Sequence, residues 1–289
     1  MIELMVRMRR YALRWGLSNI RQIDYKSVTM NRLFTCNSAE HGECILKVGY
    51  DIKEIKNEYN ILQEYKGTRF CKVYEADIEN GILLLERIIP GIELREELDL
   101  DKRLELFCEV FSALHIQAAD KSIYPTYMGW VSRITEYMRG RKDYEILANK
   151  MTQAERICIE LCEKFSGEML LHGDLHHHNI LLGKNNYYRI IDPKGVIGDR
   201  VFDIPRFISN EFDGFASNES KAEVDHDFDK KFKYIIKTFS EKFDIPEQDI
   251  LHLAYVEMCM AQCWHVESGQ EPNMNFVMFA EKMITEGEV

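Results

Sequence analysis

Residues 170–182 read LLHGDLHHHNILL, a loop with one acid, four histidines and one asparagine between two apolar runs. Such apolar runs are typical of buried strand ends, where polar groups are costly unless they have partners or a function. Asp174 is followed five positions later by Asn179, and a second strand-like run, YYRII at residues 187–191, ends in Asp192. If the two strands form a hairpin, these three oxygen-bearing side chains meet at one end of it.

Two carboxylates and an amide oxygen are hard ligands, which suit Mg²⁺ on phosphate oxygens better than they suit zinc. One acid can then lie beside the metal while the other serves as a base, which are the two roles that phosphoryl transfer to a hydroxyl needs. The histidines at residues 176–178 are not expected to bind a metal, because consecutive residues in a turn rarely converge on one ion. For His172, bonding to the backbone in a buried position is a more usual role than that of a base.

The first 89 residues predict a small antiparallel sheet that carries one helix. Residues 52–66 place apolar side chains at helical spacing. The Asn-Gly pair at residues 80–81 is typical of a hairpin turn. The amphipathic segment 1–17 predicts a helix packed on this body rather than one lying on a membrane surface. The strand-like runs occupy residues 19–26, 32–36, 44–50, 71–78 and 81–89.

A Pro-Gly pair at residues 90–91 breaks this pattern, and long helical periodicities follow it. They are interrupted by short strand-like runs around residues 169–192. The sequence therefore predicts an α+β fold of two lobes, with the sheet in residues 1–89 and a larger, mainly helical lobe in residues 90–289. The helical segments are expected at residues 101–119, 131–149, 152–165, 228–243, 247–266 and 274–285.

Composition excludes several classes of protein. The net charge of −11 argues against a general nucleic-acid binder, and no apolar run is long enough to cross a bilayer. The eight cysteines include no CxxC pair, and we expect reduced thiols in a cytoplasmic protein. Residues 241–289 carry ten acids against two lysines, a balance of −8, which suits a small cationic partner or is simply a solvated acidic face.

A resemblance to a known family sharpens these expectations. HGDLHHHN at residues 172–179 looks like the catalytic loop of the aminoglycoside phosphotransferases, which share the H-x-D-x-x-x-x-N spacing of protein kinases. IDPKGVIGDRVFDIPRF at residues 191–207 resembles the next segment of the branch that contains streptomycin 6-phosphotransferases and hydroxyurea-resistance kinases. QCWHVESG at residues 262–269 resembles a C-terminal helix of that branch. The resemblance covers most of the chain and implies a protein-kinase-like fold with residues 1–89 as the nucleotide-binding lobe.

The resemblance also implies roles for individual residues. Asp174 would accept or orient the proton of the attacking hydroxyl, and Asn179 and Asp192 would hold Mg²⁺ on the phosphates of ATP. Lys47 would contact the α- and β-phosphates. Glu58 would pair with Lys47, and Glu54, one helical turn earlier, is the alternative partner. Taken alone, Lys47 could be a solvated strand lysine and Glu58 a member of a surface charge pattern.

The same resemblance implies further positions, and the sequence departs from the family pattern at others. The backbone from Glu86 to Ile88 would bond the adenine edge, and Asp203 would brace the catalytic loop, supported by His172, unless Asp203 is only a helix cap. The segment KSVTMNR at residues 26–32 has no glycine, so phosphate contacts there would come from around Ser27 and Thr29. Arg200 stands where the family often has proline.

The acceptor is expected to be a small molecule rather than a protein. The sequence GDRVFDIPRF follows Asp192 closely and no APE-like anchor stands downstream, so a peptide would lack its platform. Glu257, Trp264 and Glu267 are the candidates to bind a cationic substrate, unless they are an acidic surface with a packed tryptophan.

The function implied is phosphorylation of an aminoglycoside, at a streptomycin-like 6-hydroxyl, with resistance to the antibiotic as the result. The alternatives are a kinase of another small molecule, such as an amino alcohol or a sugar, and a nucleotide-binding module without catalysis. The sequence predicts no oligomeric state.

Overall fold

The computed structural model describes residues 2–23, 31–212 and 221–287. It divides into two compact units, Met1–Glu96 with His178–Gly195, and Glu97–His177 with Val196–Val289. The segment 178–195 therefore belongs to the unit of the N-terminal sheet. The boundary predicted from the sequence, at residue 89, places the same segment in the helical lobe. The reason is strand pairing, because β8 (Ile180–Leu182) pairs with β6 (Ile92–Glu93) on one side and with β9 (Tyr188–Ile190) on the other.

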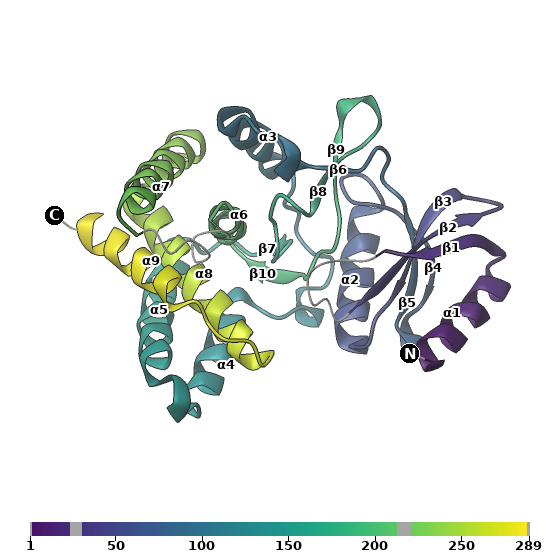
Figure 1. Ribbon diagram of the computed structural model, residues 1–289, viewed down its shortest axis with the longest axis horizontal. Helices are drawn as coiled ribbons and strands as arrows, with labels where there is room; N and C mark the ends of the chain where they lie inside the picture. The colour runs from purple at the N-terminus through teal and green to yellow at the C-terminus, as the bar shows by residue number, and fades with distance from the viewer. Residues whose placement is uncertain (1, 24–30, 213–220, 288–289) are drawn as a thin grey trace. The chain divides into compact units, whose positions relative to one another are not determined.

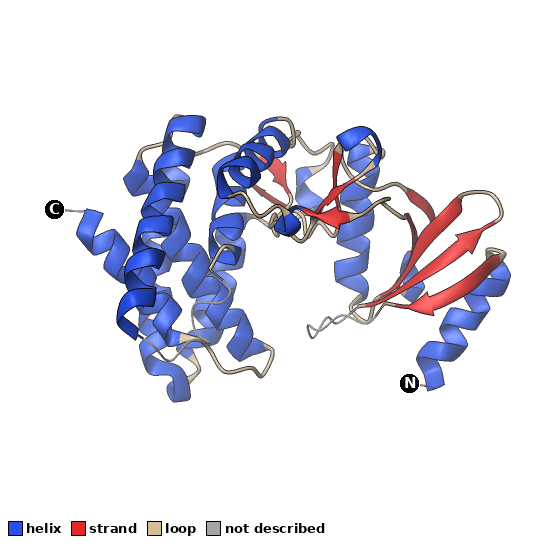
Figure 2. Cartoon of the chain, turned by 45° about the horizontal axis from the view of Figure 1, so that its top comes forward, coloured by secondary structure: helices blue, strands red, loops and turns tan. Residues whose placement is uncertain are grey.

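The first unit is built on an antiparallel five-stranded sheet in the order β1-β2-β3-β5-β4, shown in red in Figure 2. Two helices belong to it, α1 (Ile2–Arg14) and α2 (Ile52–Tyr65). Helix α2 begins where the carboxylate of Asp51 accepts hydrogen bonds from the N–H groups of Lys53 and Glu54. The strands are β1 (Leu17–Gln22), β2 (Arg32–Ser38), β3 (Gly42–Val48), β4 (Val73–Asp77) and β5 (Ile82–Glu86).

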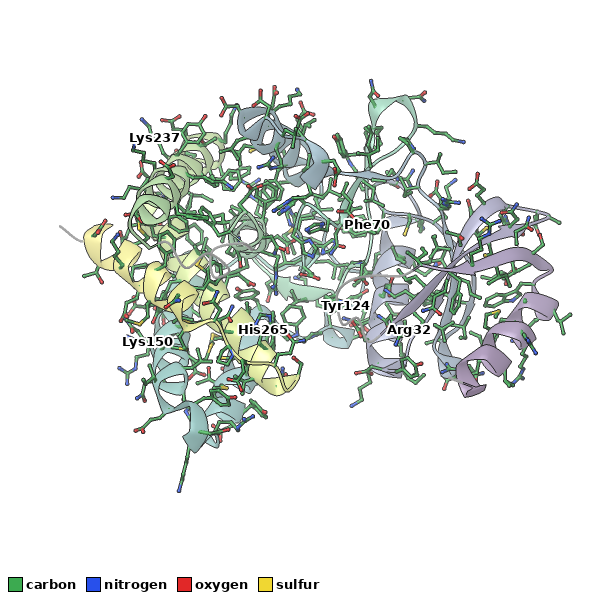
Figure 3. All side chains as sticks on the ribbon, in the orientation of Figure 1. Arg32, Phe70, Tyr124, Lys150, Lys237 and His265 are labelled. Carbon is green, nitrogen blue, oxygen red and sulfur yellow. The ribbon has the colours of Figure 1, made fainter. Side chains whose placement is uncertain are left out.

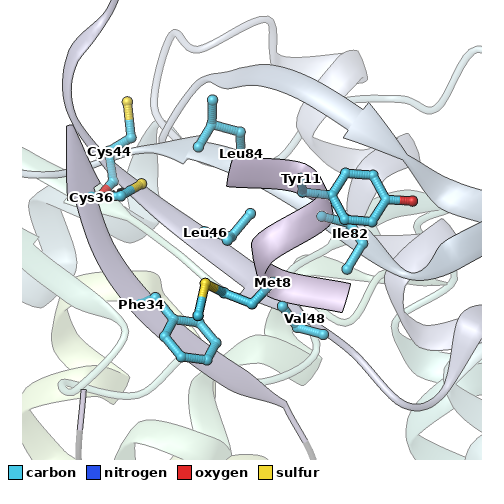
Figure 4. Packing of buried hydrophobic residues seen from close by; sticks show 9 residues of the cluster. All are labelled: Met8, Tyr11, Phe34, Cys36, Cys44, Leu46, Val48, Ile82 and Leu84. Atoms are coloured by element: carbon cyan, nitrogen blue, oxygen red, sulfur yellow. Dashed lines mark hydrogen bonds between the residues drawn. The ribbon is translucent and has the colours of Figure 1, made fainter. Parts of the chain in front are cut away.

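The two helices lie on opposite faces of this sheet (Figure 1). Strand β5, ILLLE, is buried over its first four residues, as a strand covered on both faces should be. Ile82 and Leu84 point to the side of α1, and alternation along the strand turns Leu83 and Leu85 towards α2. The cluster beneath α1 consists of Met8, Tyr11, Phe34, Cys36, Cys44, Leu46, Val48, Ile82 and Leu84 (Figure 4).

The second unit is mainly helical. It contains a short antiparallel pair of strands, β7 (Met169–Leu171) with β10 (Val196–Gly198). The loop that begins at residue 172 follows directly after β7. Helix α8 (Glu247–Glu267) is buried on nearly all sides and packs against five other helices, which explains why its sequence is apolar all round. The remaining helices are α3 (Leu100–Ser112), α4 (Tyr127–Arg139), α5 (Glu145–Lys164), α6 (Ile204–Asn210), α7 (Lys221–Phe243) and α9 (Met274–Gly287).

Most of the expected helices exist with shifted boundaries, but the helix expected at residues 131–149 is divided, because α4 ends at Arg139 and α5 begins at Glu145. Helix α3 ends at Ser112 rather than at residue 119, and the hydroxyl of Thr126 caps α4 several residues before its expected start. Helix α5 runs without a break through residues 149–152, because that stretch has no Gly or Pro to end it. Lys150 of this helix, labelled in Figure 3, forms an ion pair with Glu281 of α9. Over the described ranges, no helix combines the length and apolarity that a bilayer span requires.

Candidate active site

In the first unit, one buried lysine lies between two carboxylates. Strand β3 carries Lys47, whose Nζ is 2.7 Å from Glu58 Oε2 and 2.6 Å from Asp192 Oδ1. Lys47 is only 4% exposed and Glu58 only 1%. Burial acts to lower the pKa of Lys47, but the charges of Asp192 and Glu58 outweigh it and raise that pKa, so the ammonium stays charged. Burial raises the pKa of Glu58, an effect that the Lys47 ammonium opposes.

Asp192 follows strand β9 in a left-handed backbone conformation, with φ of 56°. Its neighbour Ile191 donates its N–H to the carbonyl of Asn179 at 3.0 Å, so the two chain segments that would hold Mg²⁺ run side by side within this unit. A carboxylate and an amide are the oxygen donors that Mg²⁺ prefers, so the residues present fit this ion. Among the described residues, no group of three or more histidine, cysteine or acidic side chains is placed to hold a metal.

A second lysine, Lys194, was missed by the sequence analysis. Its Nζ lies 2.6 Å from Glu54 Oε1 and 3.5 Å from Asp192 Oδ2. Glu54, the alternative partner proposed for Lys47, therefore pairs with Lys194 instead. The available signal was the repeat of glutamates one turn apart on α2 together with a lysine two residues after Asp192.

The remaining candidates in the first unit are placed as follows. The N–H of Glu86 donates to the carbonyl of Lys72 at 2.8 Å, and its carboxylate accepts from Arg189 at 3.0 Å, so both groups already have partners in the protein. Ile88 is buried, with 8% exposure. Ser27 and Thr29 lie outside the described residues.

In the second unit, Asp203 holds the loop that carries Asp174. The Asp203 carboxylate accepts the N–H of His172 and of Gly173, each at 2.8 Å, and lies 2.9 Å from His115 Nε2. Burial acts to raise the pKa of Asp203, but the hydrogen bond to His115 lowers it, so the carboxylate stays ionised. His172 Nδ1 in turn accepts the N–H of Asp174 at 3.1 Å.

Gly173 is required by the shape of this loop. Its φ of +77° lies in the left-handed region, and a Cβ there would come within 2.7 Å of the Trp130 ring. The backbone at Gly173 therefore packs closely against the Trp130 ring, and Asp174 is the residue that follows it.

Arg206 on α6 joins Asp174 to the substrate candidates of α8. Its Nε lies 3.2 Å from Asp174 Oδ1 and 3.0 Å from Glu257 Oε1, and its guanidinium stands over the ring of Trp264, 5.0 Å from the centroid. Burial raises the pKa of the Glu257 carboxyl, and the Arg206 charge opposes this. Glu267 is separate from this group, because both its oxygens bond Arg133, at 2.5 and 2.9 Å.

Sequence reasoning named Glu257 and Trp264 but missed Arg206, although the arginine stands in the quoted segment 191–207. Its partners are 32 and 51 positions away in the chain, and no local pattern indicates such contacts. The structure thus brings Lys47, Glu58 and Asp192 together in one unit, and Asp174, Arg206, Glu257 and Trp264 together in the other.

Comparison with known proteins identifies the class. Over 99% of this chain and 100% of the other, the fold matches the choline kinase LicA of Streptococcus pneumoniae, with a TM-score of 0.70 at 13% identity. It also matches a thermostable mutant of an aminoglycoside phosphotransferase solved with ADP and hygromycin B, with a TM-score of 0.61 at 13% identity over 96% of each chain. These likenesses confirm the predicted protein-kinase-like fold, with an antiparallel sheet at the N-terminal side and a mostly helical remainder.

The family follows from the sequence match. The model of the aminoglycoside/hydroxyurea antibiotic resistance kinases matches residues 14–269, and the chain belongs to that family. Streptomycin 3''-kinase of Klebsiella pneumoniae is 25% identical over 160 residues, which are 53% of this chain and 55% of that protein. The match thus spans about half the length of this curated relative.

Proposed function

We propose that the chain is an ATP- and Mg²⁺-dependent phosphotransferase that acts on a hydroxyl of a small cationic molecule. The observation that carries this proposal is the contact of Lys47 with both Glu58 and Asp192. A buried lysine fixed by two carboxylates offers a rigid positive charge, which suits the α- and β-phosphates of a nucleotide. Lys47 would bind those phosphates and Glu58 would fix its direction.

Asn179 and Asp192 are the residues that would hold Mg²⁺. When bound, this ion supplies positive charge that neutralises the phosphate oxygens. Asp174 would accept or orient the proton of the acceptor hydroxyl, and Asp203 would keep the loop of Asp174 in place through the N–H groups of His172 and Gly173.

For the acceptor, we propose an aminoglycoside, phosphorylated at a streptomycin-like 6-hydroxyl, with resistance as the consequence. The family match supports this substrate class. Glu257 and Trp264, the residues named for a cationic substrate, are partnered by Arg206, so a substrate cation there would have to share or replace that arginine. An amino alcohol is the second candidate, because it offers the same combination of a cation and a hydroxyl.

The test is release of ADP from Mg-ATP across a panel of aminoglycosides, amino alcohols and sugars. The Asp174→Ala variant should lose turnover by about a thousandfold while its affinity for Mg-ATP stays close to that of the wild type. Asp143→Asn is a matched control, because Asp143 is an exposed acid of the same unit that pairs with Arg141. Full turnover in Asp174→Ala, or no turnover of any acceptor by the wild type, would remove the proposal.

A further inference from the structure

Two ammonium groups share the carboxylate of Asp192. Lys47 Nζ contacts Oδ1 at 2.6 Å, and Lys194 Nζ lies 3.5 Å from Oδ2. Each lysine also has its own glutamate on α2, because Lys47 pairs with Glu58 at 2.7 Å and Lys194 pairs with Glu54 at 2.6 Å. The pair of Lys194 with Glu54 thus repeats the pair of Lys47 with Glu58, one turn earlier on α2.

The two lysines differ in their access to solvent. The side chain of Lys47 is 5% exposed, whereas those of Lys194 and Asp192 are 27% and 34% exposed. Because Lys194 Nζ lies 3.5 Å from Asp192 Oδ2, a ligand that approaches this oxygen from solvent also comes close to the Lys194 ammonium. The carboxylates of Glu54, Glu58 and Asp192 outnumber the ammonium groups of Lys47 and Lys194, so the cluster repels an added anion. A phosphate can therefore bind here only if its oxygens replace a carboxylate as the partner of an ammonium group.

The backbone of Lys194 is held independently of its side chain. Asn57 Nδ2 donates to the carbonyl of Lys194 and, at 3.1 Å, to that of Gly195. Gly195 has φ of +71°, and a Cβ there would come within 2.3 Å of Ile61, so the loop is packed directly on α2. The side chain of Lys194 is therefore not needed to keep this loop in position.

We propose that Lys194 is a second phosphate-binding lysine of the nucleotide site, which contacts the di- or triphosphate together with Lys47. A polyphosphate beside Asp192 offers both ammonium groups oxygens in place of that carboxylate. A second cation would add to any phosphate contacts from around Ser27 and Thr29, because residues 26–32 contain no glycine to bring backbone N–H groups close to phosphate. This inference rests on the proposed function, since it assigns a residue within the same nucleotide site.

The test is isothermal titration of the full chain with Mg-ATP, Mg-ADP and adenosine. Lys194→Met should bind both phosphorylated nucleotides about tenfold more weakly and adenosine as well as the wild type does, because only the phosphates lose a charged partner. Lys194→Arg keeps the charge and should retain most of the affinity. Lys56→Met, at an exposed position of α2, is the matched control and should bind all three ligands normally.

Glu54→Gln separates phosphate binding from a purely structural role. If Lys194 contacts phosphate, Glu54→Gln leaves the ammonium in place and keeps Mg-ATP affinity at or above that of the wild type. Equal losses in Glu54→Gln and Lys194→Met, extending to adenosine, would show that Lys194 only ties the loop to α2 and would overturn the inference. Wild-type affinity in Lys194→Met would do the same while leaving the proposed function intact. A wild-type chain that binds no Mg-ATP would end both.

Discussion

The guanidinium of Arg206 lies 3.2 Å from the carboxylate of Asp174, the residue to which we assign the proton of the acceptor hydroxyl. The same guanidinium is 3.0 Å from the buried carboxylate of Glu257. One cation therefore contacts two acids of the second unit, Asp174 and Glu257.

Removal of this cation should be visible in the pH dependence of turnover. In Arg206→Met, Asp174 loses a positive neighbour, which raises the pKa of its carboxyl, so the acidic limb of kcat/KM should move up by about one pH unit. The measurement is kcat/KM for the best acceptor between pH 5 and 9. Arg206→Lys keeps the charge and should keep the limb near its wild-type position, whereas an unmoved limb in Arg206→Met would contradict the assignment.

The buried pair of Lys47 and Glu58 predicts an asymmetry in stability. Lys47→Met leaves Glu58 buried without its cation and near the charge of Asp192, which should cost about 3–5 kcal/mol of the free energy of unfolding. Glu58→Gln leaves Lys47 paired with Asp192 and should cost clearly less. Urea denaturation of both variants measures the difference.

The double variant Lys47→Met/Glu58→Gln provides the control. It removes both charges, so its loss should be smaller than the sum of the single losses. A strictly additive result would mean that the two side chains do not interact in solution.

The loop contacts of Asp203 predict a loss of turnover without a loss of nucleotide affinity. Asp203→Asn replaces one acceptor oxygen by a donor, so the N–H of His172 or Gly173 loses its partner and Asp174 is less firmly held. We expect kcat to fall by about ten- to a hundredfold, while Mg-ATP binding, measured by titration, stays unchanged. Asp120→Asn, which changes an exposed acid of the same unit that accepts the N–H of Ser122, is the matched control. Equal kcat in the two variants would contradict the assignment.

Sequence reasoning predicted the parts of the site that depend on motifs. The position of Lys47 on a strand, Glu58 on the next helix and Asp203 after the loop could be proposed from the resemblance alone, and the structure gives their contacts. The strands and most helices followed from periodicity, since burial of one face imposes a pattern on each element. Helix ends were less accurate, because they depend on single caps such as Thr126.

Arg206 could not be predicted because its contacts are with acids far away in the chain, and an isolated basic residue in a short helix has no pattern that distinguishes it from a solvated one. Lys194 left a weaker signal, its place two residues after Asp192, but its pairing with Glu54 on α2 is a tertiary contact that the sequence alone does not indicate. Glu267 shows the converse. It shares a helix with Glu257 and was grouped with it, but it points to Arg133 instead.

A buried ion cluster of the second unit predicts how stability changes with pH. Arg103 donates two hydrogen bonds to Glu211, at 2.6 and 2.8 Å, and Lys231 Nζ lies 2.9 Å from the same carboxylate. Burial acts to raise the pKa of Glu211, but its bonds to Arg103 and Lys231 lower it to about 2.

Because an unfolded glutamate has a pKa of about 4.3, the cluster should contribute about 3 kcal/mol above pH 4.5. That contribution should be lost as the pH falls from 4.5 towards 2, where the folded carboxyl takes up its proton. The difference in free energy of unfolding between the wild type and Glu211→Gln should therefore be largest near pH 7 and shrink below pH 4.5, as urea titrations at several pH values would show. Glu105→Gln, which breaks an exposed pair with Lys102, should change stability little at any pH. A Glu211→Gln difference that stays constant from pH 7 to pH 3 would mean that this carboxylate is not held ionised by its two cations.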